Sequence, residues 1–299
     1  MITRIPFCLD GFNFLEVEAN DTDHDGHHAN SLIASLPANG FAIVGTRDPQ
    51  RKSFELLEKT MEELRGSDLV IVSGFARGID SRAHELALEH GLKTIAILGC
   101  GLDIDYPREN RSLRNRILDH GGLILSPFEP GTSPIPRNFL NRNQLIAYFA
   151  KAVWVVEAAA ISGTLNTARH ASDLHRDLYA TPSFPNDVFF EGNQKLLSEK
   201  DPNRYPTAHP FFDASSLGIT WQHLRSVQGK KKKTTRTNIT KIQRWILDLQ
   251  HQQGECRIQS LMNFATSQGL SPGQFYFEYE KELSSGKISE DLLGIVDLK

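Results

Sequence analysis

Residues 69–80 read Leu-Val-Ile-Val-Ser-Gly-Phe-Ala-Arg-Gly-Ile-Asp, an apolar run followed by a glycine-containing turn and the start of a helical pattern. A strand that ends in such a turn leaves unpaired backbone N–H groups at the helix start, where the helix dipole is positive. Gly74 and Gly78 permit close approach of the backbone to a ligand, and Arg77 adds a fixed charge. The stretch therefore predicts a strand–turn–helix unit that holds a phosphate group.

The alternation of short apolar runs and amphipathic stretches extends on both sides of this unit. Strands are expected at 41–44, 69–72, 94–98, 123–125, 152–156 and 178–180, and helices at 50–66, 79–90, 110–120, 137–150 and 163–175. Near-continuous apolar strands separated by helices are typical of a parallel sheet buried on both faces. The right-handed crossover rule then favours a doubly wound α/β fold.

Glycine, hydroxyl and arginine residues follow the predicted strands, at the edge where a doubly wound sheet binds its ligand. They are Gly45, Thr46 and Arg47 after the first strand, Ser73, Gly74, Arg77 and Gly78 after the second, Arg142 and Asn143 beyond the fourth, and Ser162, Gly163 and Thr164 after the fifth. Tight turns alone would explain some of the glycines but not three arginines at one edge. We therefore predict a basic phosphate-binding pocket at this edge.

Composition excludes several classes of protein. The chain has 299 residues, a net charge of −3 and three cysteines that form no Cys-x-x-Cys pair. A disulfide framework, a metal site and a bound cofactor are not expected. No apolar run is long enough to span a bilayer, so we expect a cytoplasmic protein without a membrane partner.

The chain is expected to divide into four regions. Residues 1–37 form an N-terminal extension without an assigned fold, 38–225 the sheet core, 226–237 a basic linker, and 238–299 a small domain. The small domain has the pattern of three helices, one at 258–267, and a hairpin near its end, which is typical of a winged helix. Its third helix is rich in glutamate, which favours contact with protein over sequence-specific reading of DNA.

The acidic stretch 21–26 begins like a calcium-binding loop. The pattern needs a bidentate acid at its twelfth position, where this chain has Leu32. We therefore interpret the stretch as a solvated acidic loop.

The motifs of the core together resemble the DNA-processing protein A family (DprA, also called Smf). They are residues 73–80 with Ala83-His84, 99–107 with Asn110, Arg142-Asn143, Glu157 with 162–168, and 192–197. The resemblance implies an extended Rossmann core that binds single-stranded DNA and is not an enzyme. It also implies a role in natural transformation and DNA recombination, a RecA-type recombinase as partner, and a homodimer.

Within this resemblance, Arg47 of Gly45-Thr46-Arg47 matches the family's phosphate-binding Gly-Ser-Arg turn. The chain departs from the family at Gln144, where Arg-Asn-Arg is frequent, and at Pro127, where a Ser-Glu pair is frequent. The helical N-terminal domain common in the family is not evident in residues 1–37.

The mechanism that follows is electrostatic and tolerant of sequence. Arg47, Arg77 and Arg142 are expected to contact successive phosphates. Four aromatic residues are candidates for stacking on bases, although each taken singly is more typical of packing. They are Phe75, Tyr106, Phe128 and Phe139.

Two alternatives remain for the same pocket. A nucleotide hydrolase related to the phosphoribohydrolases would need the acid that Thr167 replaces here, which leaves only Asp80 and Glu157 nearby. Asp80 is instead expected to cap its helix or to hold Arg77. A sensor of a nucleotide-derived small molecule would use the same chemistry; a closed cavity would favour it, and a groove would favour a strand.

Overall fold

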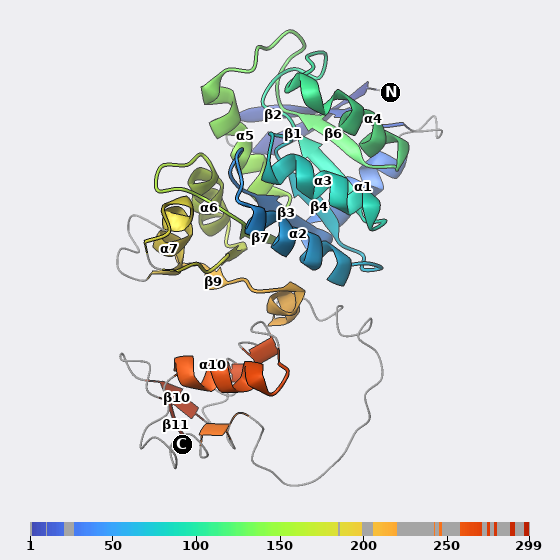
Figure 1. The fold of residues 1–299 in the computed structure, drawn as a ribbon. Coiled ribbons are helices and arrows are strands. Elements are labelled where there is room, and N and C mark those ends of the chain that lie inside the picture. The colour runs from blue at the N-terminus through green and yellow to red at the C-terminus, as the bar shows by residue number, and fades with distance from the viewer. Residues whose placement is uncertain are drawn as a thin grey trace. The chain divides into compact units, whose positions relative to one another are not determined.

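The computed structural model describes residues 2–9, 11–20, 27–184, 186–198, 206–219, 242, 245–246, 258–270, 274–275, 278–279, 288–290 and 296–298. The chain divides into two compact units, Met1–Phe211 and Phe212–Lys299 (Figure 1). In the described part of the chain, no helix is long and apolar enough to cross a membrane. The acidic stretch 21–26 and the basic linker 226–237 lie outside the described residues.

The first unit is built on a nine-stranded sheet in the order β1-β2-β6-β5-β4-β3-β7-β8-β9. The strands are β1 (Ile2–Leu9), β2 (Phe12–Glu18), β3 (Gly40–Val44), β4 (Val70–Ser73), β5 (Lys93–Ile97), β6 (Leu123–Ser126), β7 (Ala152–Val155), β8 (Asp177–Ala180) and β9 (His209–Pro210). All neighbours from β6 through β3 to β9 pair in parallel. The doubly wound α/β prediction is confirmed, and β3 to β8 lie where strands were expected.

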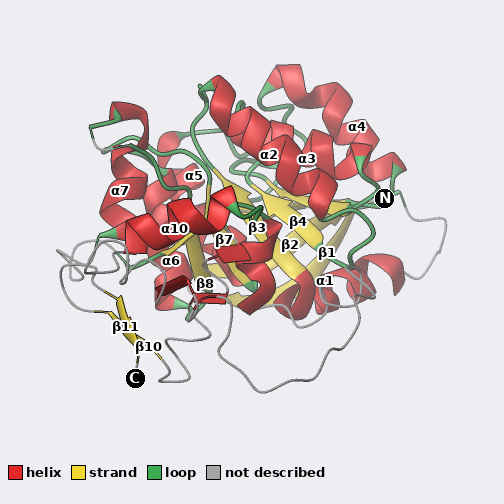
Figure 2. Cartoon of the chain, turned by 60° about the horizontal axis from the view of Figure 1, so that its bottom comes forward, coloured by secondary structure: helices red, strands yellow, loops and turns green. Residues whose placement is uncertain are grey.

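Helices cover both faces of this sheet, as Figure 2 shows. They are α1 (His27–Asn39), α2 (Arg51–Glu63), α3 (Ile79–Glu89), α4 (Arg111–Asp119), α5 (Pro136–Tyr148), α6 (Thr164–Asp173) and α7 (Glu191–Leu197), with short 3-10 turns at Arg108–Asn110 and Val188–Phe190. Alternate strand residues face opposite sides: Ile95 and Ile97 pack with α1, α5 and α6, whereas Ala96 packs with α3 and α4. Burial on both faces explains the continuous apolar runs.

Strand order reverses between β3 and β7. The chain proceeds from β3 through β4 and β5 to β6 in one direction, and from β7 through β8 to β9 in the other. At such a switch point the connections from neighbouring strands leave for different sides of the sheet, and a crevice opens beyond the carboxyl ends. The turns after β3 and β7, which carry predicted site residues, therefore flank the crevice.

Residues 2–18, to which the sequence analysis assigned no fold, form an antiparallel extension of the sheet. β1 pairs with β2, and β2 pairs with β6, where Val17 lies opposite Leu125. Leu15 and Val17 are buried in the same core as the parallel strands. The N-terminal segment is therefore part of the first unit and covers what would otherwise be the free edge of β6.

The second unit has a separate small core. The described residues include α10 (Ile258–Ser267) and the antiparallel strands β10 (Ile288–Glu290) and β11 (Val296–Leu298). Its buried members include Ile246, Leu261 and Phe275. A helix and a hairpin thus occur at positions where the sequence predicts them, whereas the winged-helix assignment and the four-region division stay predictions.

Candidate functional site

Two open pockets adjoin at the carboxyl edge of the sheet. The switch-point pocket, of about 530 Å³, is lined by the turns after β3 and β7 and by α5. The second pocket, of about 410 Å³, is lined by the turns after β4 and β5. Five residues line both pockets: Arg47, Ala76, Tyr106, Pro134 and Phe139. The two pockets therefore adjoin at these shared residues, and we refer to the two together as the groove.

The divide is built around the Phe139 ring. The guanidinium carbon of Arg47 lies 5.8 Å from the centroid of this ring, and the Tyr106 ring lies 5.5 Å from it. Gly99 makes room for the ring, because a Cβ at this position would lie 2.5 Å from Phe139 Cδ1. An exposed arginine beside two aromatic rings is a surface on which a phosphate and a base could both be held.

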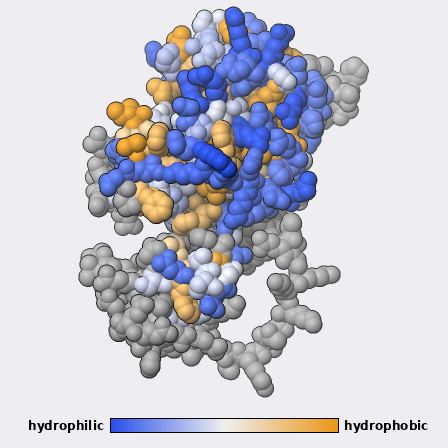
Figure 3. Space-filling view, viewed as in Figure 1, coloured by the Kyte–Doolittle hydropathy of each residue, from blue (hydrophilic) through white to orange (hydrophobic). Residues whose placement is uncertain are grey.

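Polar and apolar residues both line the two pockets. Hydrophilic residues cover most of the face of the first unit that Figure 3 shows, and hydrophobic residues form smaller groups. Leu140 and Ile161 are exposed apolar residues that line the switch-point pocket. Of the other aromatic candidates, Phe75 lines the second pocket but is buried, and Phe128 packs against Phe12 and lines neither pocket.

Arg142 lines the switch-point pocket from beneath. Its side chain is almost fully buried, and Nη1 donates to the carbonyl oxygens of Gly74, at 2.5 Å, and of Ile97. The guanidinium thus joins α5 to the ends of β4 and β5. These contacts give Arg142 a part in shaping the pocket, and the phosphate contact expected from sequence stays a prediction.

Asp80 lies near Arg142 and does not hold Arg77, which corrects one of the two roles expected for it from sequence. The buried Asp80 carboxylate accepts a hydrogen bond from Ala76 N at 3.4 Å, and Arg142 is its principal charged neighbour. Burial raises the pKa of Asp80 to about 6, although Arg142 opposes that shift. Burial likewise lowers the pKa of Arg142 to about 10. Arg77 is instead exposed and pairs with Glu109 at 3.6 Å.

The two glycines of the opening motif serve the protein's own packing. A Cβ on Gly74 would lie 2.7 Å from Asp80 Oδ2, and a Cβ on Gly78, where φ is 79°, would lie 2.5 Å from Thr46 O. The N–H of Ile79, at the start of α3, donates to the same Thr46 carbonyl at 3.2 Å. The open helix start that the sequence suggested is therefore partly closed by the turn that carries Arg47.

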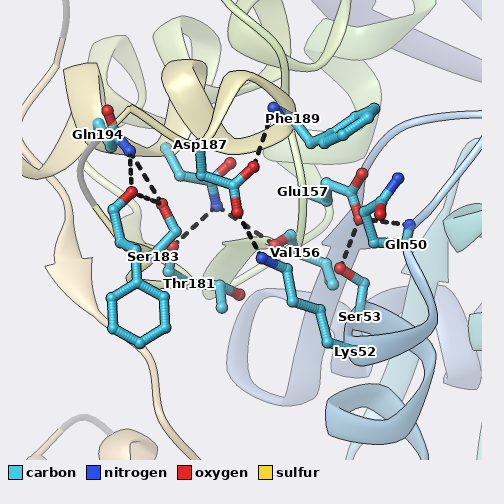
Figure 4. Close-up of polar contacts among 12 residues, drawn as sticks. Gln50, Lys52, Ser53, Val156, Glu157, Thr181, Ser183, Asp187, Phe189 and Gln194 are labelled. Atoms are coloured by element: carbon cyan, nitrogen blue, oxygen red, sulfur yellow. Dashed lines mark hydrogen bonds and ion pairs between the residues drawn. The ribbon is translucent and has the colours of Figure 1, made fainter.

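Glu157 holds this turn in place (Figure 4). Its Oε2 accepts hydrogen bonds from Gln50 N at 2.9 Å and from Ser53 Oγ at 2.5 Å, and its carbonyl accepts from Thr46 N at 2.9 Å. Burial raises the pKa of Glu157. Glu157 lines neither pocket, so its role is structural. It fixes both ends of the segment that bears Arg47.

The remaining predicted residues are tied into the fold to different degrees. Ser73 is buried, and its hydroxyl donates to Ile43 O at 2.6 Å. Asn143 Nδ2 donates to Gly163 O at 3.2 Å, and Ser162 Oγ accepts from Thr164 N at 3.2 Å. Every predicted residue except Ser73 and Gly78 lines one of the two pockets.

Sequence reasoning singled out the run 99–107 and Tyr106, but it missed two pocket-lining residues just beyond that run and one after β6. Arg108 and Glu109 line the second pocket, and Pro134 lines both. The signal was present in the run of glycine and polar residues at 99–107, which follows a predicted strand as the other site turns do.

His84 is buried, with its ring centroid 5.9 Å from that of Phe75, and its proton position is defined. Its Nδ1 lies 2.6 Å from Thr94 Oγ1, while the Thr94 hydroxyl donates to Ile71 O at 2.9 Å. Because that hydroxyl proton is already used, His84 Nδ1–H must be the donor. Among the described residues, His84 Nε2 has no hydrogen-bond partner. Burial, with a smaller effect of Arg142, lowers the pKa of His84 to about 3.

Acidification is expected to destabilise the first unit through His84. In the unfolded chain His84 takes up a proton near pH 6.5, whereas in the folded chain it does so only near pH 3. The contribution of neutral His84 to the free energy of unfolding is therefore fully present above about pH 6.5 and is lost as the pH falls towards 3. At about pH 5 the loss is about 2 kcal/mol. Urea unfolding of wild type and His84→Gln at about pH 7 and about pH 5 measures it. An imidazole NMR resonance of His84 that titrates near its ordinary pKa would contradict the prediction.

Comparisons with known proteins identify relatives of the first unit. Residues 31–212 match the family model of DNA recombination-mediator protein A. DNA processing protein DprA of Streptococcus pneumoniae is 41% identical over 159 residues, which are 53% of this chain and 55% of that protein. Protein Smf of Escherichia coli is 39% identical over 167 residues, 56% of this chain and 45% of that protein. The chain spans about half the length of these curated relatives.

Solved structures give the same result. DNA processing protein A from Streptococcus pneumoniae has a TM-score of 0.59 and 32% identity, covering 71% of this chain and 68% of that chain. DNA processing protein A from Helicobacter pylori has a TM-score of 0.58 and 28% identity, covering 73% of this chain and 94% of that chain. The likeness therefore extends from local motifs to the arrangement of the sheet and helices.

Proposed function

The chain belongs to the DNA recombination-mediator protein A family, and we propose that its first unit binds single-stranded DNA through the phosphate backbone, along the groove at the carboxyl edge of the sheet. The observation that carries the proposal is the pair of adjoining open pockets that share Arg47, Tyr106 and Phe139. The solved structure of the Helicobacter pylori relative concerns a single-stranded DNA binding mode of that protein, which supports the same substrate class here.

The shape of the site favours a strand over an isolated small molecule. Each pocket has the volume of a small-molecule site, but both are open and they meet at Arg47 and Phe139. A polymer with regularly spaced phosphates and bases can occupy both pockets at once. The Arg47 guanidinium and the aromatic rings of Tyr106 and Phe139 at the divide suit binding that is insensitive to base sequence.

We extend the proposal to the setting of the protein. Membership of the family supports a role in DNA recombination and uptake, with transfer of the bound strand to a RecA-type recombinase by a homodimer. A homodimer would double the length of strand contacted and raise the avidity without new types of contact.

A hydrolase is the less favoured function for the same groove. Asp80 lines the switch-point pocket and has a raised pKa, as a general acid would, but its carboxylate is buried near the Arg142 cation and accepts a hydrogen bond from Ala76 N. Glu157, the other candidate acid, is engaged by Gln50 and Ser53 and lines neither pocket. We therefore propose binding without catalysis, and release of free base from nucleoside monophosphates would contradict it.

Single-stranded DNA binding is expected to weaken about tenfold between about 50 mM and about 200 mM salt, because each neutralised phosphate contributes a slope of about 0.7 and the groove contacts two or three. Fluorescence anisotropy of a labelled oligo(dT) measures the affinity at each salt concentration. Unlabelled nucleoside monophosphate serves as a competitor. Absence of salt-sensitive binding would overturn the proposal, and displacement of the strand by equimolar mononucleotide would favour a small-molecule sensor.

A further inference from the structure

The second pocket lies to one side of the switch point and has its own set of charged residues. Arg77, Arg108, Asp105 and Glu109 line it, and none of the four lines the switch-point pocket. Because the two pockets meet at Arg47 and Phe139, a strand bound at the switch point has a direct path into the second pocket. The path passes from the ends of β3 and β7 to the ends of β4 and β5.

A wall of the second pocket carries an unusual backbone conformation. Phe75 has φ of 62°, a left-handed conformation that a bulky side chain rarely adopts. The buried Asn110 side chain donates to Phe75 O at 3.0 Å and so helps to hold this conformation. Strained backbone that the surrounding structure maintains is concentrated at ligand-binding sites. Here it precedes Ala76 and Arg77, which face the pocket.

The arginine at this pocket already has an anionic neighbour. Arg77 Nε lies 3.6 Å from Glu109 Oε1, and both side chains are more than half exposed, at 64% and 54%. Exposed pairs of this kind are weak because water screens them. A phosphate offers a guanidinium two acceptor oxygens and a better geometric match. The Glu109 carboxylate thus stands beside the arginine where the phosphate of an entering strand would bind.

We propose that the second pocket receives the nucleotide adjacent to the one held at the switch point, that Arg77 binds its phosphate, and that Glu109 competes with that phosphate for Arg77. This inference rests on the proposed binding of single-stranded DNA. In this arrangement Glu109 limits the affinity of the groove, and the strand gains the second contact only by displacing the carboxylate. Removal of the Glu109 charge should therefore strengthen binding.

Glu109→Gln is expected to bind a labelled oligo(dT) of about 20 nucleotides about three- to tenfold more tightly than wild type at low salt, since the variant lacks both the competitor and its repulsion of phosphate. Arg77→Ala is expected to bind more weakly than wild type. In the Arg77→Ala background, the gain from Glu109→Gln should shrink to the small part that comes from repulsion of phosphate alone. A gain in affinity cannot arise from partial unfolding, which makes the test independent of the stability of the variant.

Glu89→Gln is the matched control. Glu89 is an exposed glutamate that pairs with Arg82 at 3.2 Å, and it lies at the end of α3, away from the carboxyl edge of the sheet. The control removes the same charge from the chain, and its affinity should stay within about twofold of wild type. Equal gains in affinity in both glutamine variants, or no gain in Glu109→Gln while wild type binds, would overturn the proposed role of the second pocket but not the proposed function. Wild type that does not bind the strand would overturn both.

Discussion

Replacing Arg142 with methionine is expected to lower the free energy of unfolding of the first unit by about 3–5 kcal/mol at neutral pH. Methionine fills a similar volume but leaves the buried Asp80 carboxylate without its cation. The carbonyls of Gly74 and Ile97 also lose their guanidinium donor. Removing the cation near a buried carboxylate is costly because the remaining charge stays out of water.

Urea unfolding of Arg142→Met and of Arg137→Met measures this effect. Arg137 is an exposed arginine on the same helix, so its replacement should change the free energy of unfolding by less than about 0.5 kcal/mol. Arg142 lowers the pKa of Asp80, so without it that pKa lies above about 6. A carboxyl group whose pKa is raised in the folded state lowers the free energy of unfolding most at high pH, where it is ionised. The loss of unfolding free energy in Arg142→Met should therefore shrink at about pH 5, as Asp80 protonates. Equal losses for the two arginines, or a loss independent of pH, would show that Arg142 does not hold Asp80.

The parallel strands could be predicted because each is decided within a few residues. β4 and β7 are short apolar runs bounded by turn residues. Because both faces of each strand are buried, the runs are apolar throughout and are easily told apart from surface segments. Strand order could not be predicted in the same way, because it depends on pairing between segments far apart in sequence. The switch point between β3 and β7, which places the larger pocket, appears only in the structure.

The N-terminal hairpin was missed although the sequence contains a signal for it. Asp10-Gly11 separates two runs of alternating character, a combination typical of a tight hairpin, and Gly11 has φ of 84°. Two features obscure this signal, Pro6 within the first run and the acidic stretch that follows the second, because proline is rare inside strands. β1 pairs only with β2 in the sheet, where a proline is tolerated, and that position is not visible from sequence.

The site could be located from sequence, but the roles of its arginines could not be separated. Arg47, Arg77 and Arg142 are the same residue type at the same edge of the sheet. What distinguishes them is the space around each: Gly74 lets the Arg142 guanidinium lie against the backbone, whereas Arg47 and Arg77 are exposed. Such differences depend on contacts between distant segments, so the phosphate contacts predicted from sequence stay predictions until they are measured.

Replacing Arg47 with alanine is expected to weaken binding of a single strand about 10- to 100-fold at low salt, the range for loss of a charge-assisted hydrogen bond. Among the charged residues that the structure describes, Arg47 alone lines both pockets, so a strand that follows the groove must pass it. Its guanidinium carbon lies 5.8 Å from the centroid of the Phe139 ring, and Arg47 has no ion pair among the described residues. The free energy of unfolding should therefore be nearly unchanged.

Arg51→Ala is the control for a general effect of charge. Arg51 begins α2, a few residues beyond Arg47, is 92% exposed, and pairs with Glu55 rather than lining either pocket. Its loss should change affinity by less than about twofold, and equal losses in the two variants would remove Arg47 from the proposed contact. The salt dependence carries the sharper distinction. Loss of one phosphate contact should reduce the slope of log affinity against log salt concentration by about 0.7. A loss of affinity with an unchanged slope would mean that Arg47 acts through the Phe139 ring on a base, because only neutralisation of a phosphate releases counterions.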